Sequence, residues 1–241
     1  MGGIVRYPAV NDMAAFIDAP DPIYGSGHDG DATLDGTTTV LGMAPTSSVY
    51  TMTRDMYFDD LTINAGVRLM PAGYRIFVKN VLTLNTNSII GFVTGFATAG
   101  SIAQGGAAAT SVTHSMGGGG ISSPAGTTYT ATAPTAALGG TDWFNIPHQA
   151  VLGYSVTASG GPTFLRGGAG GTGQAGGGVV ILAARYISGP TSGTASIQAP
   201  ATAPAGGGVV IIISAEASLP ASISTSVTGQ NAGTVKFMTM V

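Results

Sequence analysis

The chain has 241 residues, of which 8% are charged and 39 are glycine, and its net charge is −3. Typical soluble domains carry roughly 25% charged residues, so this composition predicts a surface that other copies or other proteins cover. The scattered eight Lys and Arg disfavour nucleic-acid binding, which needs clustered cations. The absence of Cys excludes disulfides, thiolate zinc sites and a cysteine nucleophile. A 44% hydrophobic content argues against wholesale disorder.

Residues 1–50 form the first predicted unit, an extended arm. Closely spaced prolines and glycines at 20–22 and 25–27 interrupt any long helix or strand. Such a segment either docks onto another protein or is a loosely packed terminus. The first residues lack the layout of a signal peptide, which predicts synthesis and assembly in the cytoplasm. No apolar run reaches the length of a membrane-spanning helix, so no membrane insertion is expected.

Three acids in this arm are weak candidates for a metal site, namely Asp29, Asp31 and Asp35. Oxygen ligands at this density can bind calcium. The calcium-loop pattern requires Gly at its sixth position and Glu at its twelfth, where this chain has Leu34 and Val40. We therefore expect solvated turn acids and no bound metal or other cofactor.

Residues 51–93 are predicted to form short strands separated by tight corners. The corners are expected at 64–66, 71–73, Asn80 and 85–87. Apolar residues alternate within the strands, which places them on one inward face: Leu61 and Ile63, Val67 and Leu69, Ile76 and Val78, Leu82 and Leu84. Thr62, Arg68, Phe77 and Thr83 are then outward. This spacing favours an all-β fold of the β-helix (β-solenoid) type, with a β-sandwich built from hairpins as the alternative.

Residues 94–175 are predicted to be a glycine-rich insertion that carries an aromatic island. The island consists of Trp143, Phe144, His148, Tyr154 and Phe164. Aromatic side chains concentrate binding energy, so the island is the candidate site for binding a surface glycan or another protein partner. The competing interpretation is that Trp143 and Phe144 fasten the insertion to the core of the strands.

Residues 176–241 contain a repeated phrase and complete the predicted β domain. Gly-Gly-Gly-Val-Val-Ile at 176–181 recurs at 206–211. A repeat of this kind indicates one supersecondary unit stacked on a copy of itself, here a glycine-rich turn that leads into a strand. A further strand is expected near Ile223, and the apolar strand at 235–238 should pair with a neighbour.

Catalytic constellations are weak, and the chain is predicted not to be an enzyme. Asp55, Asp59 and Asp60 lie close in sequence near Arg54. Glycoside cleavage needs two acids that face one another, whereas consecutive strand residues point to opposite faces. We expect Asp59 and Asp60 to be a corner before a strand.

Two further patterns carry little weight. The glycine pattern at 168–173 leads into a strand and not into the helix that dinucleotide binding requires. A Ser-His-Asp triad has no nucleophile elbow to support it, and the three histidines lie in loop-like settings: His28, His114 and His148.

Residues 54–66 and 73–79, Arg-Asp-Met-Tyr-Phe-Asp-Asp-Leu-Thr-Ile-Asn-Ala-Gly and Gly-Tyr-Arg-Ile-Phe-Val-Lys, resemble a block found in structural proteins of tailed bacteriophages. In those minor tail proteins, tail fibres and glycine-rich virion proteins, Gly-Gly-Gly-Val-Val-Ile strands follow glycine-rich sequence. The resemblance covers roughly residues 51–90 and 176–215. It implies a trimeric, non-enzymatic component of the particle surface.

These observations give one functional hypothesis with two alternatives. The chain is expected to be a homotrimeric tail fibre or minor tail protein that contacts the host, attached to other virion proteins through residues 1–50. The first alternative is a capsid decoration protein or head fibre. The second is a β-helical polysaccharide depolymerase, which the scarcity of acids beyond residue 60, Asp142 and Glu216, disfavours.

Overall fold

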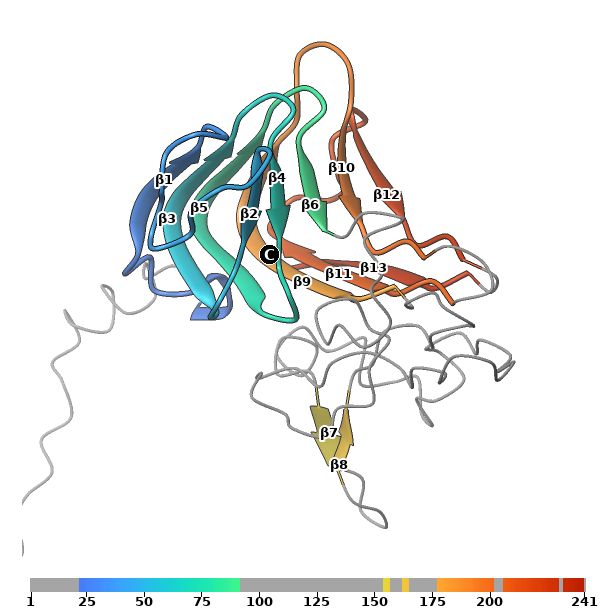
Figure 1. Cartoon of the computed structure of the whole chain (residues 1–241). Coiled ribbons are helices and arrows are strands. Elements are labelled where there is room, and N and C mark those ends of the chain that lie inside the picture. The colour runs from blue at the N-terminus through green and yellow to red at the C-terminus, as the bar shows by residue number, and fades with distance from the viewer. Residues whose placement is uncertain are drawn as a thin grey trace, which may run out of the picture.

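The computed structural model describes residues 22–91, 177–201, 206–229 and 232–240, and the backbone of 154–156 and 162–164. Within these ranges the chain forms strands and a single short 3₁₀ helix, η1 (Pro22–Tyr24). The prediction of an all-β protein is therefore confirmed. Figure 1 shows the strands gathered into two large sheets, while β7 and β8 form a separate pair.

Two parallel sheets contain most of the strands. The first has six, in the order β1-β3-β5-β9-β11-β13, and the second has five, in the order β12-β10-β6-β4-β2. The six are β1 (Gly30–Leu34), β3 (Met56–Ile63), β5 (Arg75–Leu84), β9 (Val179–Ser188), β11 (Val209–Ser214) and β13 (Thr234–Thr239). The five are β2 (Val49–Thr51), β4 (Arg68–Met70), β6 (Ile89–Gly91), β10 (Ala195–Gln198) and β12 (Ile223–Ser226).

Within the two large sheets the described chain alternates from one sheet to the other. Each strand pairs in parallel with the strand that precedes it in the same sheet, and one strand of the other sheet lies between the two in the sequence. Consecutive strands therefore do not form hairpins in these two sheets, and the alternative hairpin sandwich has no support there. The glycine-rich insertion falls between β6 and β9, yet β5 still pairs with β9 and β6 with β10.

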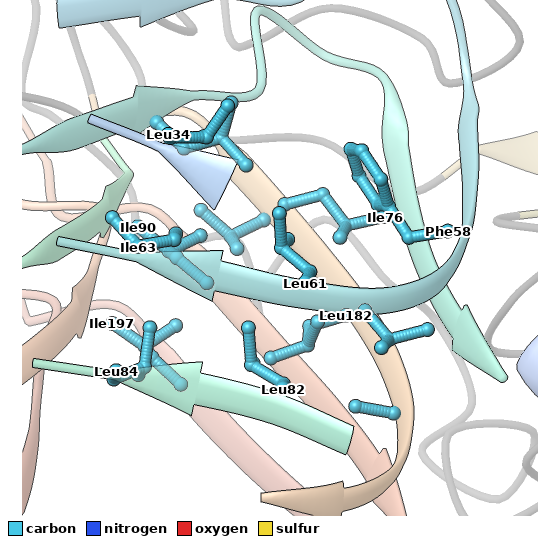
Figure 2. Close-up of a cluster of buried hydrophobic side chains, with 14 of the residues drawn as sticks. Leu34, Phe58, Leu61, Ile63, Ile76, Leu82, Leu84, Ile90, Leu182 and Ile197 are labelled. Carbon is cyan, nitrogen blue, oxygen red and sulfur yellow. The ribbon is translucent and has the colours of Figure 1, made fainter. Parts of the chain in front are cut away.

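The main hydrophobic core lies between the two sheets. The alternating pairs predicted to face inward, from Leu61 and Ile63 through Leu82 and Leu84, are all buried. Figure 2 shows Leu61, Leu82 and Leu182, from β3, β5 and β9, among the side chains of this interior. The period-two pattern thus identified the core face correctly.

The two copies of the repeated phrase stack on one another in register. Val209 pairs with Val179, Val210 with Val180 and Ile211 with Ile181, which confirms the prediction. Alternate residues pack into the main core, and the others belong to a second apolar cluster on the outer face. Burial of both faces explains why these strands are continuous apolar runs and do not alternate.

Three predicted corners are confirmed, and the fourth is wrong. Turns occur within 64–66, 71–73 and 85–87, but Asn80 lies inside β5. The pairing of β5 with β9 shifts between Val78 and Val81, which marks a β-bulge. A bulge bends a strand without ending it, so two predicted strands form one.

The arm predicted at residues 1–50 is described from residue 22 onward. Residues 22–50 contribute η1, β1 and part of β2, and their Leu34 and Tyr50 side chains are fully buried. These residues are integral to the sheets and do not form an extended segment. Residues 1–21 lie outside the described ranges, and attachment through residues 1–50 stays a prediction, as do the predicted domain boundaries.

Candidate functional site

The aromatic island is described in part. Trp143, Phe144 and His148 lie outside the described residues. Tyr154 begins β7 (Tyr154–Val156) and Phe164 ends β8 (Pro162–Phe164), and these two residues are register partners in an antiparallel pair. The backbone therefore places Tyr154 opposite Phe164, and a binding role for the island stays a prediction.

Asp29, one of the weak metal candidates, is held in an ion pair. Arg54 donates from Nη1 to Asp29 Oδ2 at 2.9 Å and from Nη2 to Oδ1 at 2.5 Å. The backbone N–H of Tyr57 also donates to Oδ2 at 2.7 Å. With a side chain only 5% exposed, Asp29 is not the solvated acid that we expected. The Arg54 hydrogen bonds hold the pKa of this carboxyl below its usual range, although burial opposes them.

Asp35, the second metal candidate, organises the turn after β1. Its Oδ1 accepts the backbone N–H groups of Thr37 and Thr38, both at 2.7 Å, and its Oδ2 accepts the Thr38 hydroxyl at 2.6 Å. The hydroxyl of buried Tyr50 shares its one hydrogen between this carboxylate, at 3.1 Å, and Thr38 O, at 2.8 Å. Because these bonds favour the charged form, with those from Thr38 the strongest, the pKa of Asp35 lies well below its usual value.

Asp55 repeats the arrangement of Asp29 one strand further along the sheet. The backbone N–H of Arg75 donates to Asp55 Oδ1 at 2.8 Å, and Arg75 Nε donates to Oδ2 at 2.9 Å. In each case the acid directly precedes a strand. It accepts one hydrogen bond from a backbone N–H of the neighbouring strand in the sheet and others from a guanidinium group. We call Asp29, Arg54, Asp55 and Arg75 the charge ladder. Its carboxylates hold neighbouring strands together.

The three remaining acids of this region lie at the stacked bulges. Asp31, the third metal candidate, accepts the backbone N–H of Asp60 at 3.2 Å, and Asp60 accepts that of Val81 at 2.8 Å. Asp59 accepts from Asn80 Nδ2 at 2.9 Å and lies 3.1 Å from Lys79 Nζ. Asp59 and Asp60 therefore lie within β3, and the expected corner before a strand is wrong. These carboxylates form hydrogen bonds between neighbouring strands.

A Ser-His-Asp grouping does occur, but its geometry does not build a triad. Ser26 Oγ lies 2.8 Å from His28 Nδ1, while His28 Nε2 lies 3.8 Å from Asp29 Oδ1. The second distance exceeds that of a hydrogen bond, and Asp29 is already bound by Arg54. His114, His148 and the glycine pattern at 168–173 lie outside the described ranges. Within those ranges no three potential metal ligands gather.

An aromatic stack on the outer face of the six-stranded sheet was not foreseen from the sequence. The rings of Tyr57 and Phe77 are parallel with centroids 4.7 Å apart, and His28 follows at 4.8 Å from Tyr57. Phe77 does point away from the main core, as predicted, but Ile23 and Tyr24 belong to the cluster that buries it. The two rings stack because the register of β3 and β5 pairs Tyr57 with Phe77, and the sequence alone does not reveal that register.

Close approach of the segment after η1 completes this stack. A Cβ at Gly25 would lie 2.7 Å from Phe77 Cβ and 3.0 Å from Tyr57 Cδ1. Glycine is therefore required for the chain to cover these rings. Further along the sheet Tyr186 is 44% exposed, with the Arg185 guanidinium 5.5 Å from its ring centroid.

No protein-family model, curated protein or solved structure matches this chain. Among the described residues, no helix has the length and apolar character needed to cross a membrane.

Proposed function

We propose that this chain is a non-enzymatic structural protein of a bacteriophage virion, built on a two-sheet β-helix and displayed on the particle surface as a tail fibre or minor tail protein. The observation that carries the proposal is the alternation of strands between two parallel sheets. Each passage of the chain adds one strand to each sheet, which supports the winding of a solenoid. Such a scaffold suits an extended, rigid surface component.

The use of the acidic side chains also supports a structural role. Asp29, Asp35, Asp55, Asp59 and Asp60 each accept hydrogen bonds from neighbouring backbone or side-chain groups. Hydrolysis by paired acids needs two carboxylates free to face a substrate, which disfavours a depolymerase. The low charge of the chain agrees with assembly into a homotrimer and with attachment to other virion proteins, because an uncharged surface protects a monomer poorly.

Immunogold electron microscopy tests the placement on a particle. Antibodies raised against the purified chain would be applied to intact particles from cells that carry the gene. We expect gold on the tails, because a fibre that contacts the host must project from the tail. Gold on the heads would favour the capsid decoration protein or head fibre. Absence of gold from every particle, with denatured particles as the positive control, would contradict the proposal.

An adsorption assay tests host contact through the aromatic island. Purified chain should compete with particles for host cells, and Trp143→Ala should weaken that competition by about tenfold or more, as for a binding hot spot. The thermal midpoint of the variant should match that of the unmodified chain. Tyr186→Ala, which removes an exposed ring from the sheet, is the matched control and should compete normally. A large fall in the thermal midpoint of Trp143→Ala would instead assign Trp143 to the core.

A further inference from the structure

The two ends of the paired sheets differ, and the end at β1 and β2 is closed. Residues 35–48 connect these two edge strands and so cross the end of the core. Met43 in this connection is 2% exposed and belongs to the main core, and Val40 packs against it. The hydroxyl of Tyr50 donates to Thr38 O at 2.8 Å and accepts from Gly36 N at 3.1 Å. The connection therefore acts as a cap.

The end at β12 and β13 lacks an equivalent cap among the described residues. The clearest measure is one apolar row that crosses three strands of the sheet. Val180 and Val210 are fully buried, whereas Val235, their register partner in β13, is 38% exposed. In the next row Leu182 and Ile212 are fully buried, and Phe237 is only partly covered. Side chains that face the interior elsewhere are thus accessible at this end.

Other apolar residues extend this open surface. Leu219 and Val227 flank β12, and both pack against the main core while remaining partly exposed. Figure 1 places β12 and β13 at the opposite end of the two sheets from β1. We call Leu219, Val227, Val235 and Phe237 the open end.

The backbone of β13 is also available at this end. Among the described strands β13 pairs with β11 alone. Thr234 N–H donates to Gly208 O and Met240 N–H to Ser214 O, so the even-numbered residues face β11. In a parallel pair alternate residues bond to the same neighbour. The N–H groups of Val235, Phe237 and Thr239 therefore point outward, as at an edge that can accept another strand.

The four side chains of the open end are uncharged, and the one charge within β13 belongs to Lys236, which alternates with Val235 and Phe237 and so points to the other face of the sheet. Between Glu216 and Lys236 there is no Asp, Glu, Lys or Arg. Natural sheet edges usually carry charges that block pairing with another copy. Two identical surfaces can meet without repulsion only where they lack like charges, so this feature favours self-association over binding to a strongly charged partner.

From these observations we infer that a second copy of this chain covers the open end, so that β12 and β13 form the interface between subunits. The inference deepens the proposed function, because it names the surface that would join the subunits of the proposed homotrimer. The cap at the β1 end makes repeated head-to-tail stacking unfavourable. Three open ends that meet around one axis, each covered by the next copy, produce a closed trimer, whereas head-to-tail stacking of capped ends on open ends produces filaments.

Light scattering on the full chain tests this inference with three variants. The unmodified chain should have the mass of a trimer, three times the 23.7 kDa of one chain. Val235→Glu, which adds a charge to the open end, should fall to the mass of one chain with unchanged β-type circular dichroism. Leu41→Glu is the matched control, because Leu41 is 39% exposed in the cap at the other end. It should keep the mass of the unmodified chain.

Val235→Pro provides a second test that keeps the side chain apolar. It removes an outward N–H without breaking a bond to β11, which an edge strand tolerates. It should also yield single chains, and it decides the matter if Val235→Glu does not fold. A single-chain mass for the unmodified protein, or an unchanged oligomer in both folded Val235 variants, would overturn the inference. Neither result would affect the immunogold or adsorption results, so failure of the proposed function would be recognised separately.

Discussion

The carboxylates of the N-terminal strands show how single residues bind one passage of the chain to the next. Asp29 and Asp55 each accept a backbone N–H from the adjacent strand and a guanidinium from Arg54 or Arg75. Charge-assisted bonds of this kind are stronger than neutral ones. A chain with few charges thus uses several of them where its N-terminal strands stack.

Acid should weaken the folded state because two of these acids have lowered pKa values. The Arg54 bonds lower the pKa of Asp29, and the Thr38 bonds lower that of Asp35. A carboxyl whose folded pKa is depressed stabilises the fold above its unfolded pKa, about 3.9, and this contribution is lost as the pH falls through the folded value. We expect the thermal midpoint to decrease from about pH 4 downward, measured by circular dichroism melts at several pH values.

Asp35→Asn should isolate one part of this pH dependence. The amide retains an acceptor for the turn but loses the charge, so the thermal midpoint should fall at pH 7. The difference from the unmodified chain should shrink as the pH falls below about 4, because the unfolded carboxyl then takes up its proton while the folded one, with its lowered pKa, is the last to do so. Asp31→Asn is the control, because Asp31 accepts a single hydrogen bond among those described, at 3.2 Å. A difference that stayed constant with pH would refute the assignment to the Asp35 charge.

At the scale of elements, the glycines of the repeated phrase bring neighbouring backbones into close contact. A Cβ at Gly208 would lie 2.1 Å from Gly178 O, and one at Gly177 would lie 2.2 Å from Gly208 N. Gly207 and Gly233 are equally crowded by backbone atoms. The triplets are therefore a steric requirement of stacking, which follows from the absence of a side chain.

Gly208→Ala should accordingly destabilise the fold by about 2 kcal/mol or more, since backbone atoms cannot move aside as a flexible side chain can. Gly42→Ala is the matched control: it has open space around it and a φ of +81°, so its cost is limited to about 1 kcal/mol of backbone strain. Urea denaturation of both variants measures the difference. An equal loss in the two variants would show that crowding at Gly208 is relieved at little cost.

For the molecule as a whole, the two sheets continue past the insertion as if it were absent. Gly91 is the register partner of Gln198, and Val179 is that of Val209. The gap between Gly91 and the start of β9 therefore corresponds to the gap that residues 199–208 bridge between β10 and β11. The insertion occupies the place of an ordinary connection.

Residues 94–175 can be replaced with a short Gly/Ser linker, so that the connection becomes as long as residues 199–208. This replacement should preserve the fold. We expect β-type circular dichroism and a single cooperative melting transition, because the core residues lie in the strands on either side. Under the proposed function, the same variant should no longer compete with particles for host cells, which is also the direction expected for Trp143→Ala. Loss of the melting transition would mean that the insertion contributes to the core.

The sequence determined the strand content, the inward rows and the stacking of the repeated phrase, because period two and in-register repeats are local properties of the chain. It did not determine that Lys79 and Asn80 form a bulge, nor that Asp29 and Asp55 are ion-paired, because these depend on the neighbouring strand. The aromatic island stays a prediction from the sequence, to which the structure adds the pairing of Tyr154 with Phe164. Only the tertiary structure revealed a capped and an open end, because the exposure of Val235 depends on which strands and connections cover it and not on the residues next to it in the chain.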